Sequence, residues 1–292
     1  MNFAYYLHDE KSQQEFERTL LWFKDKYNLV SINELRALVY ENKPLKNACM
    51  LSVDDGWRST YDVIYPVMKK YNVPFTVFVS PETMESGRNF WYYTLHYCDE
   101  VEVKDILVRR GWFQRGVRSY PIELILKEIP IDEIEDVLAE CLHNHPEVTV
   151  PRGFMNTEEV MELHRSGLVE VGAHTLTHPI LSVEDAERSH MEITASVERL
   201  SDILGKRVTS FAYPNGIERV DYDEREMQFA KDADIEMAFS VDPGLITAKC
   251  NPLSIPRWGS MARLRFGRFG QYLPSRMNQA KIRADIRKYK LR

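Results

Sequence analysis

Short runs of β-forming residues alternate with helical patterns along this chain, and this alternation limits the possible folds more than any other feature. Strands and helices that follow one another in this way are typical of an α/β architecture with parallel strands. The patterns predict crossover helices over 13–27, 33–41, 60–71, 158–166, 183–204 and 222–233. They predict seven strands, over 3–7, 48–53, 75–80, 169–173, 209–213, 235–241 and 253–257.

The interval from 81 to 150 breaks the alternation. Its length of about 70 residues exceeds that of ordinary loops. It holds an aromatic run at 90–93 and helical patterns over 122–127 and 131–142. We therefore expect one domain with a helical insertion at 81–150, which serves either as a structural cap or as a lid over the substrate.

Composition excludes several classes of protein. With 44% hydrophobic and 11% aromatic residues among 292, the chain can form a large core and is not expected to be disordered. No run approaches the roughly 18 apolar residues of a membrane span. The first residues lack the order of a signal peptide, so the sequence predicts a cytoplasmic protein, in peripheral contact with a membrane at most.

The end of the chain is strongly basic. Residues 258–292, together with Arg257, carry eleven Lys and Arg against one acid, Asp285, whereas the whole chain has a net charge of −6. Three interpretations remain open: a surface for anionic lipid headgroups or membrane, a nucleic-acid patch, or packing against the acidic remainder of the chain. Because no nucleic-acid recognition motif accompanies the charges, no nucleic-acid partner is expected.

Two adjacent carboxylates, Asp54 and Asp55, follow a predicted strand and precede Gly56. Polar residues at the carboxyl end of parallel strands commonly face the ligand site. Adjacent carboxylates repel each other, and a metal ion would relieve that repulsion. The alternative is an ordinary Asp-Gly turn.

Two further segments also follow predicted strands. His174 and His178 are four residues apart, and with Asp55 they can form a site of two imidazoles and one carboxylate for a divalent cation. The Pro-Asn-Gly turn at 214–216 exposes backbone N–H groups that can donate to a developing oxyanion, with Asn215 at its centre.

The three segments together resemble the polysaccharide deacetylase family, also called NodB-homology or carbohydrate esterase family four. They are SVDDG at 52–56, HTLTHP at 174–179 and FAYPNG at 211–216, in the family's order. The resemblance covers 1–83 and 151–257. It implies a distorted (β/α) barrel with about seven parallel strands over 1–257, and metal-dependent removal of the N-acetyl group from an amino sugar.

The resemblance also implies roles for individual residues. Asp54 is the implied general base, and Asp55, His174 and His178 are the implied ligands of a divalent metal, with zinc as first choice and cobalt, nickel or iron as alternatives. A metal-bound water is the implied nucleophile. The backbone N–H of Asn215 is implied to bind the oxyanion.

The sequence departs from the family pattern in two places. Ala212 stands where many members have an arginine that orients the base, and no histidine follows His190. The segment ending in His8 looks like the family's final histidine motif moved to the N-terminus, as in a circular permutation, since the first and last strands of a closed barrel are neighbours. We therefore predict His8 as the catalytic acid and Arg257 as the replacement for the missing arginine.

Alternatives to this function remain open. The expected partner is an N-acylated amino sugar or glycan, and the alternatives are deformylation of a lipid-linked amino sugar and carbohydrate binding without catalysis. Four aromatic residues either stack on a sugar or pack in the core: Trp57, Trp91, Tyr213 and Trp258.

Overall fold

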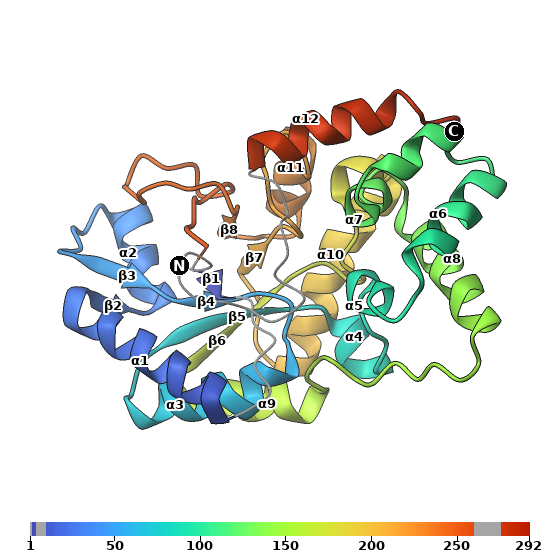
Figure 1. Ribbon diagram of the computed structural model, residues 1–292. Coiled ribbons are helices and arrows are strands. Elements are labelled where there is room, and N and C mark those ends of the chain that lie inside the picture. Colours follow the sequence, from blue (N-terminus) through green and yellow to red (C-terminus); the bar gives the residue numbers. More distant parts are fainter. Residues whose placement is uncertain (1, 4–9, 260–275) are drawn as a thin grey trace.

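The main sheet has six parallel strands that follow one another across the sheet in chain order (Figure 1). The computed structural model describes residues 2–3, 10–259 and 276–292. Parallel strands in chain order with helices between them are the arrangement of the (β/α) barrel class. The strands are β1 (Asn2–Phe3), β4 (Ser52–Val53), β5 (Phe75–Val79), β6 (Val169–Ala173), β7 (Ser210–Ala212) and β8 (Met237–Phe239).

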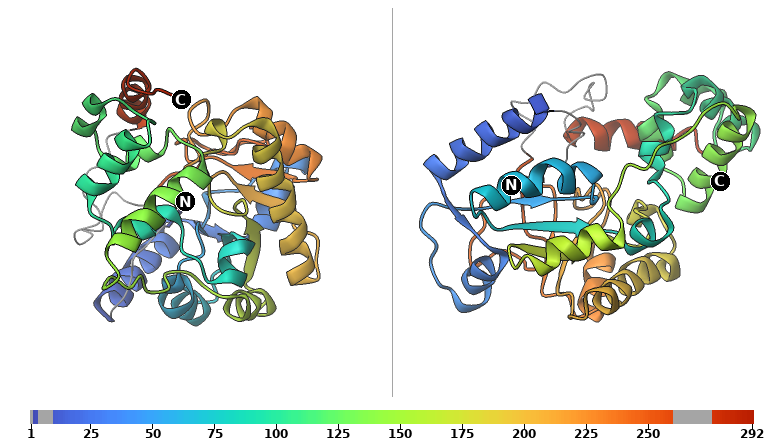
Figure 2. Two further views of the ribbon diagram at one scale, coloured as in Figure 1. Left: turned by 90° about the vertical axis from the view of Figure 1, so that its right-hand side faces the viewer. Right: turned by 90° about the horizontal axis from the view of Figure 1, so that it is seen from below.

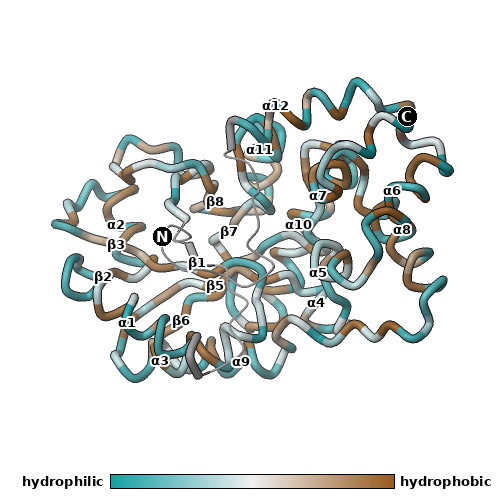
Figure 3. The backbone as a smooth tube through the Cα atoms, in the orientation of Figure 1, coloured by the Kyte–Doolittle hydropathy of each residue, from teal (hydrophilic) through white to brown (hydrophobic). Residues whose placement is uncertain are grey.

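The central strands are apolar on both faces. Every residue of β5 is buried, and the tube in Figure 3 is largely brown along the middle of the sheet. Continuous apolar runs of this kind are expected where both faces of a parallel sheet are covered. The longest pairing joins β5 to β6, from Phe75 opposite Val169 to Val79 opposite Ala173. The carboxyl ends of the strands therefore meet at one edge of the sheet.

The expected number of seven strands is not confirmed. The predicted strand at 48–53 is divided: β3 (Ala48–Met50) pairs with β2 (Asn28–Val30) in a separate two-stranded sheet, and β4 continues in the main sheet. The sequence patterns gave no signal for β2. The predicted strand at 253–257 forms only an isolated bridge, between Ile255 and Phe239. Residues 4–7 of the first predicted strand lie outside the described residues.

Helices surround the sheet close to where the sequence predicted them. α10 begins three residues late because the Asp185 side chain accepts the backbone N–H of Arg188 and caps the helix there. Figure 2 shows these helices from two further sides. They are α1 (Glu10–Lys26), α2 (Ile32–Glu41), η1 (Thr60–Ile64), α3 (Tyr65–Lys70), α9 (Thr157–Arg165), η3 (Leu181–Val183), α10 (Ala186–Leu204) and α11 (Glu224–Asp232).

The insertion is helical and has a hydrophobic core of its own. This core includes Leu107, Leu126 and Leu138 from three insertion helices. It also includes Ile286 of α12 (Arg276–Arg287), and Figure 1 shows α12 above α7. The insertion elements are α4 (Pro81–Ser86), α5 (Trp91–Leu95), α6 (Glu100–Arg109), η2 (Arg115–Ser119), α7 (Ile122–Leu126) and α8 (Ile131–Asn144).

The described part of the basic C-terminal segment packs against the rest of the chain. Arg283 of α12 is 1% exposed and donates hydrogen bonds to the carboxylates of Glu128 and Asp221 and, at 2.9 Å, to the carbonyl of Lys127. Of the three interpretations of the basic segment, packing against acidic groups therefore holds for Arg283 and Arg287 of α12. In the part of the chain that the structure describes, no helix is both long and apolar enough to cross a membrane.

Gly172 of β6 lies where two elements approach closely. A Cβ atom added there would lie 2.6 Å from ring atoms of the buried Phe78 and 2.6 Å from the Ser210 hydroxyl. We expect Gly172→Ala to lower the free energy of unfolding by about 1–3 kcal/mol through overpacking, measured by urea denaturation. Gly259→Ala is the control, because a Cβ there meets no atom of the described residues within 4 Å. Equal free energies of unfolding for the two variants would contradict the prediction that Gly172 has no room for a side chain.

Candidate active site

The polar residues of the three sequence motifs lie in loops that leave the sheet at its carboxyl edge. Asp54 and Asp55 follow β4, His174 follows β6, and Asn215 lies three residues after β7. β6 and β7 are paired neighbours, and β5 separates β4 from β6. Strands that run in parallel bring the residues after their ends to the same side of the sheet. The fold thus gathers chemistry-bearing residues from three distant parts of the chain.

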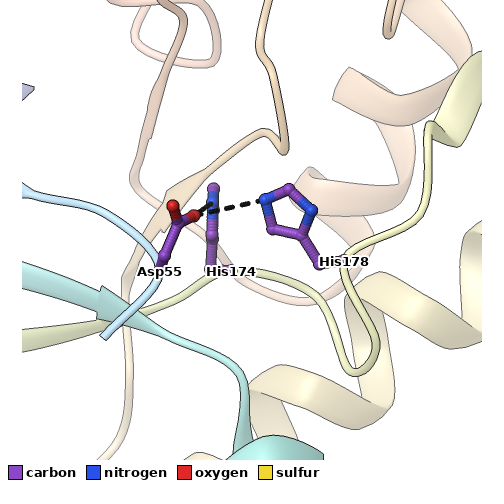
Figure 4. Close-up of side chains that lie close together, drawn as sticks. All are labelled: Asp55, His174 and His178. Atoms are coloured by element: carbon purple, nitrogen blue, oxygen red, sulfur yellow. Dashed lines mark hydrogen bonds and ion pairs between the residues drawn. The ribbon is translucent and has the colours of Figure 1, made fainter. Parts of the chain in front are cut away.

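Asp55, His174 and His178 form the one group of potential metal ligands found among residues 2–3, 10–259 and 276–292. Figure 4 shows both imidazoles directed at the carboxylate. Oδ1 of Asp55 lies 3.2 Å from Nε2 of His174 and 3.2 Å from Nε2 of His178. The three donor atoms lie within 4.8 Å of one another, so a single divalent ion can contact all of them.

A backbone hydrogen bond determines which nitrogen of His174 faces this group. Nδ1 lies 2.6 Å from the carbonyl oxygen of Ala212, and because a carbonyl can only accept, Nδ1 carries the proton. In the neutral imidazole, Nε2 then directs a lone pair at the Asp55 carboxylate. Two acceptors 3.2 Å apart share a cation, which is either a proton on Nε2 or a metal ion that takes its place. The donor set therefore fits a divalent metal.

The pKa values describe the charge state of the group. Burial by itself would raise the pKa of Asp55, but the hydrogen bonds and charges of His174 and His178 hold it well below its usual range. Burial would lower the pKa of His174, but the Asp55 hydrogen bond and the two aspartate charges raise it. For His178, burial prevails and lowers the pKa. An ionised Asp55 beside a neutral His178 is the form in which these side chains bind metal.

Glu192 of α10 holds the loop between the two histidines. Its buried carboxylate accepts hydrogen bonds from the backbone N–H groups of Leu176 and Thr177, each at 2.9 Å, and from the Thr177 hydroxyl at 2.7 Å. Within the loop, the Thr175 hydroxyl accepts the N–H of His178 at 3.0 Å. The spacing of the ligands thus depends on a buried acid that the sequence motifs did not indicate.

The site loops contain strained backbone. A left-handed conformation costs a non-glycine residue about 1–3 kcal/mol and tends to occur at functional sites, where the surrounding structure enforces it. Both Asp55 and His178 adopt it, so the strain falls on the metal-ligand candidates themselves. The residues and their φ angles are Asp55 (71°), Thr175 (63°), His178 (64°) and Asn215 (59°).

Arg257 contacts Asp54 in a buried, two-pronged ion pair. Its Nη1 donates to Oδ1 at 2.8 Å and its Nη2 to Oδ2 at 2.9 Å. Two more of its N–H groups donate to the Ser240 carbonyl at 2.8 Å and the Ser52 hydroxyl at 3.1 Å. Such bidentate pairing fixes the plane of a carboxylate. The prediction that Arg257 stands beside Asp54, in place of an arginine at position 212, is confirmed in its geometry.

The turn that carries Asn215 is held by neighbouring loops. The Gly216 carbonyl accepts the N–H of Val241 at 2.8 Å, and the Asp221 carboxylate accepts the N–H of Ile217 at 3.0 Å. Nδ2 of Asn215 is buried, and no described residue accepts a hydrogen bond from it. The role of the Asn215 backbone N–H remains a prediction. His8 lies outside the described residues, so its assignment as the acid also remains a prediction.

The insertion forms one wall of the site. The ring of Phe90 lies 4.8 Å and that of Tyr92 5.1 Å from the imidazole of His178, measured between centroids. Nε1 of Trp91 donates to the His178 carbonyl at 3.3 Å. The aromatic run at 90–93 was therefore the sequence signal for a part of the site. Of the four candidates for sugar stacking, Trp57, Trp91 and Tyr213 are buried and Trp258 is exposed.

Comparison with known proteins agrees with this geometry. The family model for polysaccharide deacetylases matches residues 41–238, which include the three motifs. The chain is similar to the putative polysaccharide deacetylase YxkH of Bacillus subtilis (strain 168), with 19% identity over 265 residues that cover 90% of this chain and 70% of that protein.

Solved structures with the same fold are similarly distant in sequence. The deacetylase PplD of Streptococcus pyogenes, in complex with acetate, is 17% identical with a TM-score of 0.58, over 89% of each chain. IcaB of Ammonifex degensii is 15% identical with a TM-score of 0.58, over 97% of this chain and 95% of its own. These similarities concern the fold.

Proposed function

The chain belongs to the polysaccharide deacetylase family, and from this premise we propose that it hydrolyses the N-acetyl group of an amino sugar in a glycan or glycan precursor, with Asp54 as general base. Members of this family are hydrolases of carbon–nitrogen bonds other than peptide bonds. The observation that carries the proposal is the Asp54 carboxylate, fixed by Arg257, beside the group formed by Asp55, His174 and His178.

Different residues of the site have different roles in the proposed hydrolysis. Asp55, His174 and His178 would hold a divalent ion, with zinc as first candidate and cobalt, nickel or iron as alternatives. Such an ion, when bound, polarises a carbonyl and activates water for attack. Asp54 takes the proton from the attacking water, and Arg257 keeps its carboxylate in the orientation for that transfer.

Two further steps use Asn215, which lies at the same edge of the sheet, and His8, which lies outside the described residues. The N–H of Asn215 donates to the oxyanion that forms on the acyl oxygen, for which one well-aimed donor contributes about 3–4 kcal/mol. His8 is the proposed acid that protonates the departing amine. The products are a free amino sugar and acetate.

The function is tested by Asp54→Asn, which removes the base but keeps the size of the side chain. General-base catalysis contributes about 10²–10⁴-fold, so kcat for acetate release from N-acetylglucosamine oligomers should fall by that factor. Metal content, measured by elemental analysis, should not change because Asp55 and both histidines remain. Asp62→Asn is the matched control, since Asp62 is exposed and pairs with Arg58.

Other outcomes identify other functions. Release of formate from N-formyl sugars, without acetate release, would assign a deformylase. Binding of sugar by a metal-loaded wild type that releases neither acid would assign a non-catalytic carbohydrate-binding protein. The arguments for that alternative are the missing arginine at position 212 and the missing C-terminal histidine motif, and the Arg257–Asp54 contact weakens the first of them.

The domain division remains a proposal: a barrel over 1–257 with the insertion at 81–150, and a basic segment over 258–292. The core that α12 shares with the insertion supports treating α12 as part of the insertion's fold. An anionic lipid or membrane surface remains a proposed partner of the basic segment over 258–292, of which residues 260–275 lie outside the described residues. Arg283 and Arg287 of α12 are already paired with Glu128.

A further inference from the structure

Asp55 uses its two carboxylate oxygens for different partners. Oδ1 faces both histidines at 3.2 Å. Oδ2 accepts a hydrogen bond from the indole Nε1 of Trp57 at 3.1 Å. A carboxylate can bind a metal through one oxygen or both, and it rotates easily unless a partner fixes it. The indole N–H is such a partner, because it can only donate.

Trp57 is itself held in a box of aromatic rings. Its ring centroid lies 4.5 Å from that of Phe154, 5.8 Å from that of Tyr92 and 5.7 Å from that of Tyr93. Trp57 and Phe154 also form an antiparallel backbone bridge. Tyr92 and Tyr93 belong to the insertion, and Phe154 lies just after it. Because Trp57 is only 4% exposed, its ring faces are covered by protein and do not serve a sugar.

We propose that Trp57 is a positioning residue for the metal centre: its indole N–H holds Oδ2 so that Asp55 presents Oδ1 alone to the metal, and the insertion keeps the indole in place. This inference rests on the proposed function, because it assumes that Asp55 is a metal ligand. It gives the insertion a role in the chemistry of the site that neither a structural cap nor a lid would have.

The proposal has a measurable consequence. Removal of the N–H leaves Oδ2 without its donor, and the carboxylate can then turn or bind through both oxygens. Partners that orient metal ligands typically contribute about 10–100-fold in metal affinity. A change from one coordinating oxygen to two also alters the ligand field of the metal. Co²⁺ reports both effects, since its visible absorption depends on the number and geometry of its ligands.

The test compares Trp57→Phe with Trp112→Phe, using Co²⁺ as the probe. Phenylalanine keeps an aromatic ring in the box but has no N–H. Trp112 is the matched control. Like Trp57 it is buried, and its Nε1 donates to a carboxylate, that of Glu133, at 3.1 Å, but it lies within the insertion. We expect Trp57→Phe to weaken Co²⁺ binding by about 10–100-fold and to change the spectrum. Trp112→Phe should match wild type in both.

A second variant separates orientation from folding. Phe154→Leu removes the ring nearest to the indole but leaves the N–H in the chain, and we expect a smaller loss of Co²⁺ affinity in the same direction. Thermal melting in chelator checks that each variant is folded, and if Trp57→Phe is not, the result with Phe154→Leu decides. Unchanged affinity and spectrum in the folded variant would overturn the proposal while leaving the proposed function intact. A wild type that binds no Co²⁺ would instead overturn the proposed function.

Discussion

His174→Ala should lose both the metal and the activity. The substitution deletes a ligand whose donor nitrogen is set by the Ala212 carbonyl, and it leaves only Asp55 and His178. A metal ion contributes several kcal/mol of transition-state stabilisation, so acetate release should fall by about a thousandfold or more. Elemental analysis of the purified protein should show less than one equivalent of divalent metal.

The control for this prediction is another histidine. His190 lies on the exposed side of α10, where its ring packs on Phe229 at 5.0 Å between centroids. His190→Ala should retain the metal and the activity of the wild type. If His174→Ala kept a full equivalent of tightly bound metal, the assignment of the ligands would be wrong, whatever the activity.

The largest loss of stability is expected for Arg283→Met. Methionine keeps much of the length of the side chain and the packing of α12, but it leaves the buried Asp221 carboxylate without its guanidinium partner and leaves Glu128 with Arg287 alone. Breaking a buried ion pair from one side costs about 3–5 kcal/mol. The free energy of unfolding, measured by urea denaturation, should fall by that amount.

Arg287→Met provides the comparison for Arg283→Met. Arg287 pairs with the same Glu128, but its side chain is 52% exposed. Exposed pairs contribute up to about 1 kcal/mol, so this variant should remain close to wild type in stability. A similar decrease in the free energy of unfolding for the two variants would mean that the burial of Arg283 does not determine how strongly its ion pairs stabilise the protein.

The site residues that belong to short motifs at strand ends could be predicted from sequence. Asp55, His174 and His178 each follow a strand at its carboxyl end, and the topology of parallel strands brings such positions to one edge. The contact of Arg257 with Asp54 was harder to predict. It depends on how the segment after β8, which carries Arg257, packs near the end of β4. Glu192 could not be found, since a glutamate inside a helix has no pattern that distinguishes a buried acceptor from a solvated one.

Elements that depend on long-range packing were harder to predict. The strand at 48–53 divides because β3 pairs with β2, and neither partner has an alternating pattern that indicates a separate sheet. The basic charges near the end of the chain are alike in sequence. Only packing reveals that Arg283 is buried among carboxylates whereas Arg287 is half exposed. The aromatic run at 90–93 was visible, but its contact with His178 was not.

The hydrophobic core that the insertion shares with α12 has a consequence for synthesis of the chain. Glu128 and its partner Arg283 are separated by 155 residues. At about 5–20 residues per second, a ribosome needs roughly 8–30 s to add that length. During this interval the emerging insertion lacks Ile286 and the two arginines, Arg283 and Arg287, that pair with Glu128. The nascent chain therefore exposes part of the insertion's apolar core during this interval, and chaperones that bind such surfaces have a defined period in which to act.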